Sequence, residues 1–230
     1  VATTDTELAP DPTLGVQMEV SRKAMKQTGP GLEEAIRRDM AEAIRVELDK
    51  AVFLGTGANG QPTGIFTAAD GAGGITDTTV DAAASWAAFR AAISRFMIAN
   101  AATSPSQVNI LMRPEVWDAL DGTYIETSGG EPVTGDTQWS LMTRQVPASN
   151  IVLSSNAVAA PAGDPLASNA LLTTTAGGVA PALLGIWGGV DVIRDPYSLA
   201  QSGQLKITGL LTCDVAILRA AQLEVLEGLQ

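Results

Sequence analysis

The chain contains no histidine, and this absence excludes several kinds of chemistry. Ser-His-Asp triads, Cys-His pairs and histidine-based metal sites all need an imidazole. Histidine is also the commonest general base near neutral pH. We therefore expect a protein that is not an enzyme, with no catalytic, cofactor-binding or metal-binding residues and no cofactor.

The chain is poor in basic residues and in thiols. It has 14 Lys and Arg against 25 Asp and Glu, a formal net charge of −11, and its largest basic groups are Arg22-Lys23 and Arg37-Arg38. Nucleic-acid binders neutralise phosphates with clustered Lys and Arg, so such a surface is not expected here. The one cysteine, Cys213, excludes an internal disulfide and is expected to be a buried, small apolar residue.

Long hydrophobic runs are also missing. No stretch of eighteen apolar residues occurs, so we expect no transmembrane helix and no membrane partner. The N-terminal VATTDTELAPDPT has neither the basic start nor the apolar centre of a signal peptide. Because the chain starts at Val1 rather than Met, it is expected to be a processed product, a fragment or an ordered remainder.

The strongest periodic pattern lies between two breaks, Gly29-Pro30-Gly31 and Gly55. Apolar residues recur there at helical spacing, and charged residues fill the opposite face. The apolar set is Leu32, Ile36, Met40, Ala43, Ile44, Leu48, Ala51 and Val52. Glu33 and Glu34 lie in the first turn, where the helix dipole favours them, each four residues before an arginine. The pattern predicts a helix over 32–54, more than about 30 Å long.

Weaker patterns predict the other elements. Alternation over 14–20 predicts a half-buried strand, and a second helix is expected near 83–101, with a short one after Pro114. Residues 55–79 are expected to be a long loop or a poorly patterned extended segment, and residues 121–138 an exposed loop. Further strands are expected at 108–112, 150–154, 169–175, 186–194, 203–219 and 223–228. The strands at 186–194 and 203–219 would form a long hairpin.

Gly55, Gly57 and Gly60 have the GxGxxG spacing of a dinucleotide-binding fingerprint. That fingerprint requires a strand before the glycines and a helix after them, because the helix N-terminus holds the pyrophosphate. Here the order is reversed, since a long helix runs into Gly55 and Pro62 follows the motif. No strand is expected to lead to Asp77 or Asp81, the acidic residues at the distance of a ribose ligand. A structural loop is therefore favoured.

Other groups of residues carry weaker signals. The stretch from Asp118 has the acidic residues of a calcium loop, but Ala119 stands at a ligand position, so a solvated helix end is favoured. Asp191, Asp195 and Asp214 could meet in the terminal hairpin, although a turn-initiating Asp195 beside two solvent-facing residues is favoured. The dispersed tryptophans are expected in the core or in interfaces, since no basic groove accompanies them; they are Trp86, Trp117, Trp139 and Trp187.

Two blocks of sequence carry a family resemblance. The first joins MEVSRKAM, residues 18–25, to LDKAVFLGTGANGQPTGI, residues 48–65. The second is GIWGGVDVIRDPYSLAQSGQLKITGLLTCDVAILRAAQLEVL, residues 185–226. In this order they resemble the major capsid proteins of tailed bacteriophages, which have the Hong Kong ninety-seven-type fold. The resemblance extends from about Leu14 to Leu226.

The resemblance implies an α+β fold with two domains. A peripheral domain, with the long helix and the long hairpin, would comprise residues 14–79 and 188–217. An axial mixed α/β domain would comprise residues 80–187 and 218–230 and point at a five- or six-fold axis. Residues 1–13 would be a flexible arm or the remnant of an extended loop. The implied function is structural: self-assembly into pentamers and hexamers of an icosahedral phage head, from prohead to virion, that encloses double-stranded DNA without sequence-specific binding.

The resemblance also implies partners and a location. The partners would be further copies of the chain and the scaffold, portal and maturation protease of the phage. The location would be the virion capsid, assembled in the cytoplasm of the bacterial host. Family members carry an N-terminal arm and an extended loop before the first strand, where this chain has about thirteen residues. We expect these elements to be missing, truncated or replaced.

Three further expectations complete the interpretation. Some family members crosslink through a lysine in the extended loop, but no lysine precedes Lys23, so no such isopeptide bond is expected. One alternative is an encapsulin-type nanocompartment shell, which has the same architecture. Another, from a different class, is a nucleotide-binding enzyme that uses the Gly55–Gly60 loop.

Overall fold

The computed structural model describes residues 7–28, 30–71, 73–126 and 132–230, and the chain divides into two compact units. Unit 1 comprises Val1–Gly64 and Leu184–Ala216, and unit 2 comprises Ile65–Leu183 and Ile217–Gln230. Residues 65–79 thus belong to unit 2, whereas the predicted domain division placed them with the long helix in the peripheral domain. The reason is strand β2 (Thr76–Ala82), which pairs in parallel with β10 (Leu223–Leu229) of unit 2.

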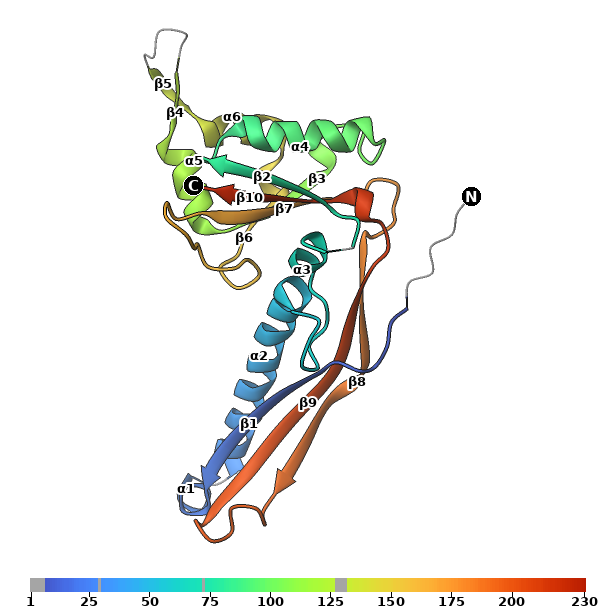
Figure 1. Ribbon diagram of the computed structural model, residues 1–230. Helices are drawn as coiled ribbons and strands as arrows, with labels where there is room; N and C mark the ends of the chain where they lie inside the picture. The colour runs from blue at the N-terminus through green and yellow to red at the C-terminus, as the bar shows by residue number, and fades with distance from the viewer. Residues whose placement is uncertain (1–6, 29, 72, 127–131) are drawn as a thin grey trace. The chain divides into compact units, whose positions relative to one another are not determined.

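Unit 1 is built on a three-stranded sheet with the order β1-β9-β8. Strand β1 (Thr13–Ser21) is antiparallel to β9 (Gln204–Ile217), and β8 (Ala182–Asp195) lies on the other side of β9. Helices α1 (Arg22–Thr28) and α2 (Pro30–Leu54) follow β1, and α2 runs along the sheet (Figure 1). The predicted long helix and long hairpin are confirmed.

The apolar face of α2 forms the core of unit 1. Ile36, Met40 and Ile44 recur every four residues and are only 6%, 2% and 3% exposed. Ile36 and Met40 pack with side chains of β1 and β9, among them Val20 and Leu205. Burial of each such side chain contributes about 1.5–3 kcal/mol. On the polar face, the predicted Glu33–Arg37 ion pair forms at 2.9 Å.

Unit 2 is built on a five-stranded mixed sheet with the order β2-β10-β7-β3-β6. Strand β7 (Ser168–Thr174) is antiparallel to β10 and to β3 (Val108–Met112), and β3 is parallel to β6 (Ile151–Leu153). The helices are α3 (Ile65–Ala69), α4 (Trp86–Ile98), α5 (Pro114–Gly122) and α6 (Gln138–Gln145), and three short 3-10 helices cover Pro105–Gln107, Ala148–Asn150 and Ala220–Gln222. The mixture of helices and strands in the two units confirms the α+β class.

The core of unit 2 lies between this sheet and its helices. Figure 1 shows α4 and α6 covering one face of the sheet. Phe89 of α4, Val108 of β3 and Leu172 of β7 have no exposed surface and belong to one hydrophobic cluster. None of the described helices has the length and the apolar character needed to span a bilayer.

Several elements lie where the sequence was interpreted as loop. The predicted loop at 55–79 contains α3 and part of β2, and the predicted loop at 121–138 contains β4 (Tyr124–Glu126) paired with β5 (Pro132–Thr137). Gly129 and Gly130 of that loop lie outside the described residues. Helix α6 was also missed; its Thr137–Ser140 capping box has Ser140 where the sequence signature has Glu or Gln.

The end of the predicted flexible arm is held by hydrogen bonds. The Ala9 N–H donates to Asp214 Oδ2 at 3.0 Å, and the Cys213 N–H donates to the Pro12 carbonyl at 3.1 Å. The Thr13 N–H donates to the Gly60 carbonyl at 3.2 Å. Residues 9–13 are therefore part of unit 1 rather than a free arm.

Candidate functional site

The glycine motif forms a closed turn at the C-terminal end of α2. Thr56 and Thr63 form an isolated antiparallel bridge, which brings the two ends of the turn together. Gly57 and Gly60 have φ values of +68° and +76°, which favour glycine. A Cβ on Gly55 would clash with the carbonyl oxygens of Ala51 and Pro62. The glycines thus serve the turn itself, as the sequence context indicated.

Backbone N–H groups at both ends of the turn are already used within it. The Gly55 N–H donates to the Ala51 carbonyl at 3.0 Å, which continues the helix. The Gly57 N–H donates to the Pro62 carbonyl at 3.1 Å, and the Gly64 N–H donates to the Gly55 carbonyl at 2.8 Å. A phosphate site needs such donors free at a helix N-terminus, whereas this helix end presents carbonyl groups.

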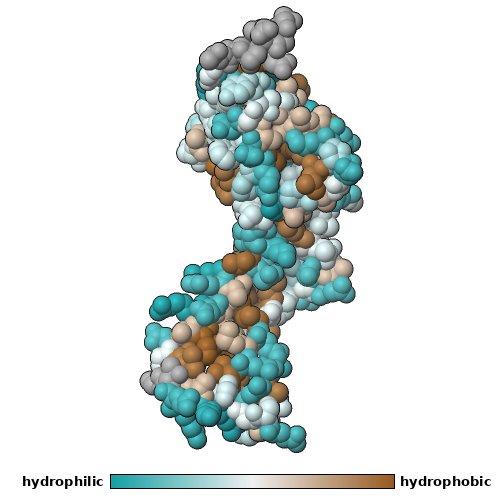
Figure 2. Space-filling view, turned by 90° about the vertical axis from the view of Figure 1, so that its left-hand side faces the viewer, coloured by the Kyte–Doolittle hydropathy of each residue, from teal (hydrophilic) through white to brown (hydrophobic). Residues whose placement is uncertain are grey.

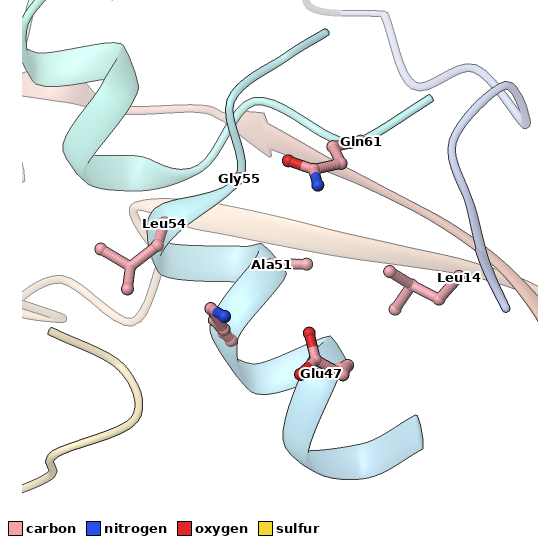
Figure 3. A pocket seen from close by; sticks show the side chains of 7 residues that line it. Leu14, Glu47, Ala51, Leu54, Gly55 and Gln61 are labelled. Carbon is pink, nitrogen blue, oxygen red and sulfur yellow. The ribbon is translucent and has the colours of Figure 1, made fainter. Parts of the chain in front are cut away.

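The pocket beside this turn is small, and its two charged lining residues have opposite signs. Figure 3 shows it at the end of α2, with Gln61 across from the helix and Leu14 to one side. Its volume is about 80 Å³, and Glu47 and Lys50 are among the lining residues. Pockets for cofactors measure roughly 300–1,000 Å³. Its size, together with the carbonyl groups at this helix end, therefore opposes the nucleotide-binding alternative at this loop.

The other acidic candidates have structural roles. Asp118 is exposed as expected, but it lies in the middle of helix α5 rather than at its end. Asp195 Oδ1 accepts hydrogen bonds from the N–H groups of Tyr197 and Ser198 at 2.8 and 3.1 Å, so it initiates the turn after β8. Asp214 accepts the hydrogen bond from Ala9 instead of joining a cluster. The turn role of Asp195 is thus confirmed and Asp191 is exposed as expected, whereas Asp214 is half-buried rather than solvent-facing.

The thiol and the tryptophans are mostly in the interior. Cys213 is buried in β9, where burial and then the nearby Asp214 carboxylate raise the pKa of its thiol. Trp117 and Trp139, distant in sequence, contact edge to face with ring centroids 6.4 Å apart. They pack on the core of unit 2, which also contains Trp86. Trp187 differs from these because it is 37% exposed on β8.

Unit 2 contains an acidic cluster that the sequence did not reveal. Among the described residues, only Asp70, Asp77 and Glu227 bring three potential ligand oxygens within 4.8 Å of one another. Asp77 and Glu227 lie on neighbouring strands, so pairing of β2 with β10 creates the cluster. Partial burial, followed by the charges of Asp77 and Asp70, raises the pKa of Glu227. Asp77 and Asp81 lie on β2, so the expectation that no strand carries them was wrong.

We expect Glu227→Gln to stabilise unit 2 by about 0.5 kcal/mol near neutral pH, because it removes repulsion between like charges. The raised pKa means that the folded protein binds this proton more tightly than the unfolded chain does. The stability that the bound proton of Glu227 contributes is complete below the ordinary glutamate pKa of 4.5. It is lost as the pH rises through the raised pKa of Glu227. Calorimetry should show that the gain from the substitution shrinks between about pH 7 and about pH 4.

Glu115→Gln provides a control of opposite sign. The Arg113 guanidinium, 2.9 Å away, holds the pKa of Glu115 below its ordinary value. This substitution should lower stability near neutral pH, and its effect should disappear as the pH falls through the lowered pKa. If both variants shifted the melting temperature in the same direction, charge would not be the cause.

Strand β8 leaves apolar side chains on the surface of unit 1. The exposed apolar side chains on its unit 1 portion are Leu184, Ile186, Trp187, Val190 and Ile193, each 37–48% exposed. Figure 2, which faces the α2 side of unit 1 rather than β8, shows further hydrophobic surface between hydrophilic residues there. Exposed apolar surface of this kind marks sites of protein association more often than sites of catalysis.

Comparison with known proteins agrees with a role in protein association. Residues 2–228 match the model of the phage capsid family, so the chain belongs to the phage capsid family. It is accordingly a structural protein, a major capsid protein with the Hong Kong ninety-seven-type fold, as the sequence resemblance indicated. No match was found among curated protein sequences.

Solved structures show the same fold at low sequence identity. The chain is similar to the capsid of a native GTA particle computed with C5 symmetry, with 16% identity, a TM-score of 0.67 and coverage of 98% of this chain and 74% of that one. It is also similar to a structure from Mycobacterium phage Che8, with 17% identity, a TM-score of 0.58 and coverage of 95% of this chain and 71% of that one. A third similar structure is the holo-SrpI encapsulin complex of Synechococcus elongatus, with 15% identity, a TM-score of 0.61 and coverage of 97% of this chain and 74% of that one.

Proposed function

We propose that copies of this chain assemble into the pentamers and hexamers of an icosahedral phage head that encloses double-stranded DNA. The observation that carries this proposal is the family match over residues 2–228. In the proposed shell, unit 1 is the peripheral domain and unit 2 the axial domain. The net charge of −11 supports a wall that encloses DNA without binding its sequence.

The proposal extends to the role of the chain in the phage. The chain acts as a building element and not as an enzyme, and it holds no cofactor or catalytic metal. Assembly takes place in the host cytoplasm with scaffold, portal and maturation protease, and the product is the virion capsid. The absence of histidine supports the lack of an active site.

Electron microscopy of the purified protein tests the proposal. We expect closed shells with five- and six-fold capsomers, because head-to-tail contacts that close by rotation generate rings. Monodisperse monomers across a wide range of protein and salt concentrations would contradict it.

An encapsulin-type shell is the second candidate, because an encapsulin complex is among the similar structures. The two candidates differ in what the particle encloses. Particles purified from the natural source after external nuclease treatment should retain double-stranded DNA if the phage interpretation is correct. A stoichiometric protein cargo without DNA would favour the second candidate.

A further inference from the structure

A groove at one end of unit 1 is lined by basic residues that are far apart in the sequence. Arg22 and Lys26 come from α1, and Arg194 comes from the end of β8. Two hydrogen bonds join these segments: the Arg22 N–H donates to the Gly203 carbonyl at 3.0 Å, and the Arg22 guanidinium donates to the Pro196 carbonyl at 2.5 Å. Figure 1 shows α1 beside the end of the hairpin that β8 and β9 form. Folding thus gathers cations that the sequence scatters.

The groove lies on the side of the unit 1 sheet that α2 covers. Side chains alternate between the two faces along a strand, and Val192, two residues before Arg194, packs against the core beneath α2. Arg194 itself lies 3.7 Å from Glu33 of α2. The groove has a volume of about 320 Å³, and its apolar lining residues, Met25 and Leu205, belong to the same core.

The positive charge of the groove is only partly balanced by carboxylates. In the described part of the chain no acidic residue lines it. Glu33 is shared between two arginines, because its oxygens lie 2.9 Å from Arg37 and 3.7 Å from Arg194. Neither Arg22 nor Lys26 forms an ion pair with another described residue. The groove therefore keeps an excess of positive charge in a chain that is acidic as a whole.

The carboxylate next to Arg194 does not neutralise the groove. Asp195 accepts hydrogen bonds from the N–H groups of Tyr197 and Ser198 at 2.8 and 3.1 Å, within its own turn. Its charge also interacts with that of Lys206, a residue of β9. The Arg194 side chain remains 53% exposed, so a ligand from solvent can reach it.

The chemistry of the groove suits phosphate groups. Guanidinium groups donate paired hydrogen bonds to phosphate oxygens, and a lysine ammonium adds a point charge. Apolar walls beside charges of one sign focus the electric field and concentrate counter-ions in a cleft. An acidic peptide with apolar side chains fits less well, because Leu205 is only 3% exposed and offers it little apolar surface.

We propose that this groove binds the backbone phosphates of double-stranded DNA. The inference rests on the proposed function, because the DNA inside the shell supplies those phosphates and the groove must open toward it. Phosphate contacts carry no sequence information, so the site agrees with a wall that reads no sequence. With three cations in a chain of net charge −11, binding is weak, with a Kd of roughly 10⁻⁴ M.

Neutral substitutions in the full chain test the site. Lys26→Gln and Arg194→Gln each remove one positive charge from the groove. The controls are matched by residue type: Lys50→Gln and Arg45→Gln change exposed residues of α2 that do not line the groove. All four side chains are exposed, so thermal melting should show that every variant folds.

Fluorescence anisotropy with two labelled DNA duplexes of unrelated sequence measures binding. We expect the wild type to bind both duplexes equally. Each groove substitution should weaken binding about fivefold to tenfold at about 0.1 M salt, whereas each control should change it less than about twofold. The slope of log K against log salt concentration should be about −2 to −3 for the wild type and less steep by about 1 in each groove variant.

Two competitors separate DNA from other anionic ligands. Inorganic phosphate should displace no more duplex than chloride does at the same ionic strength. Stronger displacement by phosphate would show a site for small anions and overturn the assignment to DNA. Binding of polyglutamate that is tighter than that of the duplex, and that the groove substitutions weaken, would overturn it in favour of an acidic peptide.

The outcomes for the groove and for the shell are separate. If the groove variants bind duplex as well as the wild type does, or the wild type does not bind duplex at about 0.05 M salt, the groove assignment is wrong, while normal shells would leave the capsid function standing. If the groove substitutions weaken duplex binding in a protein that forms no shells, the binding site is supported and the proposed assembly is contradicted.

Discussion

Arg95→Met should destabilise unit 2 by about 3–5 kcal/mol, because it leaves a buried carboxylate without its cation. Glu224 of β10 is only 1% exposed. The Arg95 Nε donates to Glu224 Oε1 at 2.8 Å, and a second guanidinium nitrogen contacts the same oxygen. Thr78 Oγ1 also donates to Glu224 Oε1, at 3.3 Å. A hydrogen bond from this neutral hydroxyl is weaker than the ion pair and cannot replace it.

Tryptophan fluorescence during denaturant unfolding can measure this effect. Three of the four tryptophans, Trp86, Trp117 and Trp139, belong to unit 2, so the signal reports mainly on that unit. Arg90→Met is the matched control, because Arg90 is exposed on the same helix. Its effect should stay within about 0.5 kcal/mol.

A double variant separates charge from packing. Replacing both members of a buried ion pair with apolar residues of similar volume is often nearly neutral. We therefore expect Arg95→Met combined with Glu224→Met to recover most of the lost stability. If the double variant were as unstable as the single one, packing of the arginine stem would be the cause, and the charge argument would be wrong.

The sequence predicted the long helix well because its signals are local. The apolar period of α2, Pro30 at its start and Gly55 after its end are all within one segment, and the observed helix, Pro30–Leu54, begins two residues before the expected one because Pro30 and Gly31 form its first turn rather than a break. The GxGxxG motif was interpretable for the same reason. Its helix-then-turn context is visible in the chain without any knowledge of tertiary contacts.

Elements that depend on distant partners were missed. Strand β2 reads TDTTVDA, with one large apolar residue, and gives no amphipathic pattern. It becomes a strand because it pairs with β10, about 150 residues away in sequence. The acidic cluster of Asp70, Asp77 and Glu227 depends on the same pairing, so composition and spacing could not reveal it.

The exposure of β8 was not predictable either. The sequence indicated a strand there, and alternating or continuous apolar residues in a strand normally suggest burial. Burial in a sheet depends on strand order, and only the structure shows that β9 is central while β8 lies at the edge. The apolar residues of β8 and β9 look alike in the sequence, yet those of β9 are buried in the core of unit 1, whereas Val192 of β8 is only partly buried against that core.

Ile44→Asp should unfold or severely destabilise unit 1, at a cost of more than about 3 kcal/mol, because it buries an unpaired charge. Ile44 is 3% exposed on the inner face of α2. Ile36→Asp should have a similar effect at 6% exposure. The periodic pattern put Leu48 on the same face, but Leu48 is only half-buried, so Leu48→Asp should be milder.

Hydrogen exchange can localise the damage to unit 1. The amides of α2 and β9 should lose protection in Ile44→Asp, while those of unit 2 should keep theirs, since the two units have separate hydrophobic clusters. Val46→Asp is the matched control, with the same chemical change two residues away at a 51% exposed position. It should keep both folding and exchange close to the wild type. Because α2 supports the three-stranded sheet of unit 1, Ile44→Asp should also abolish assembly. Normal shells from Ile44→Asp would show that α2 does not brace the sheet of unit 1.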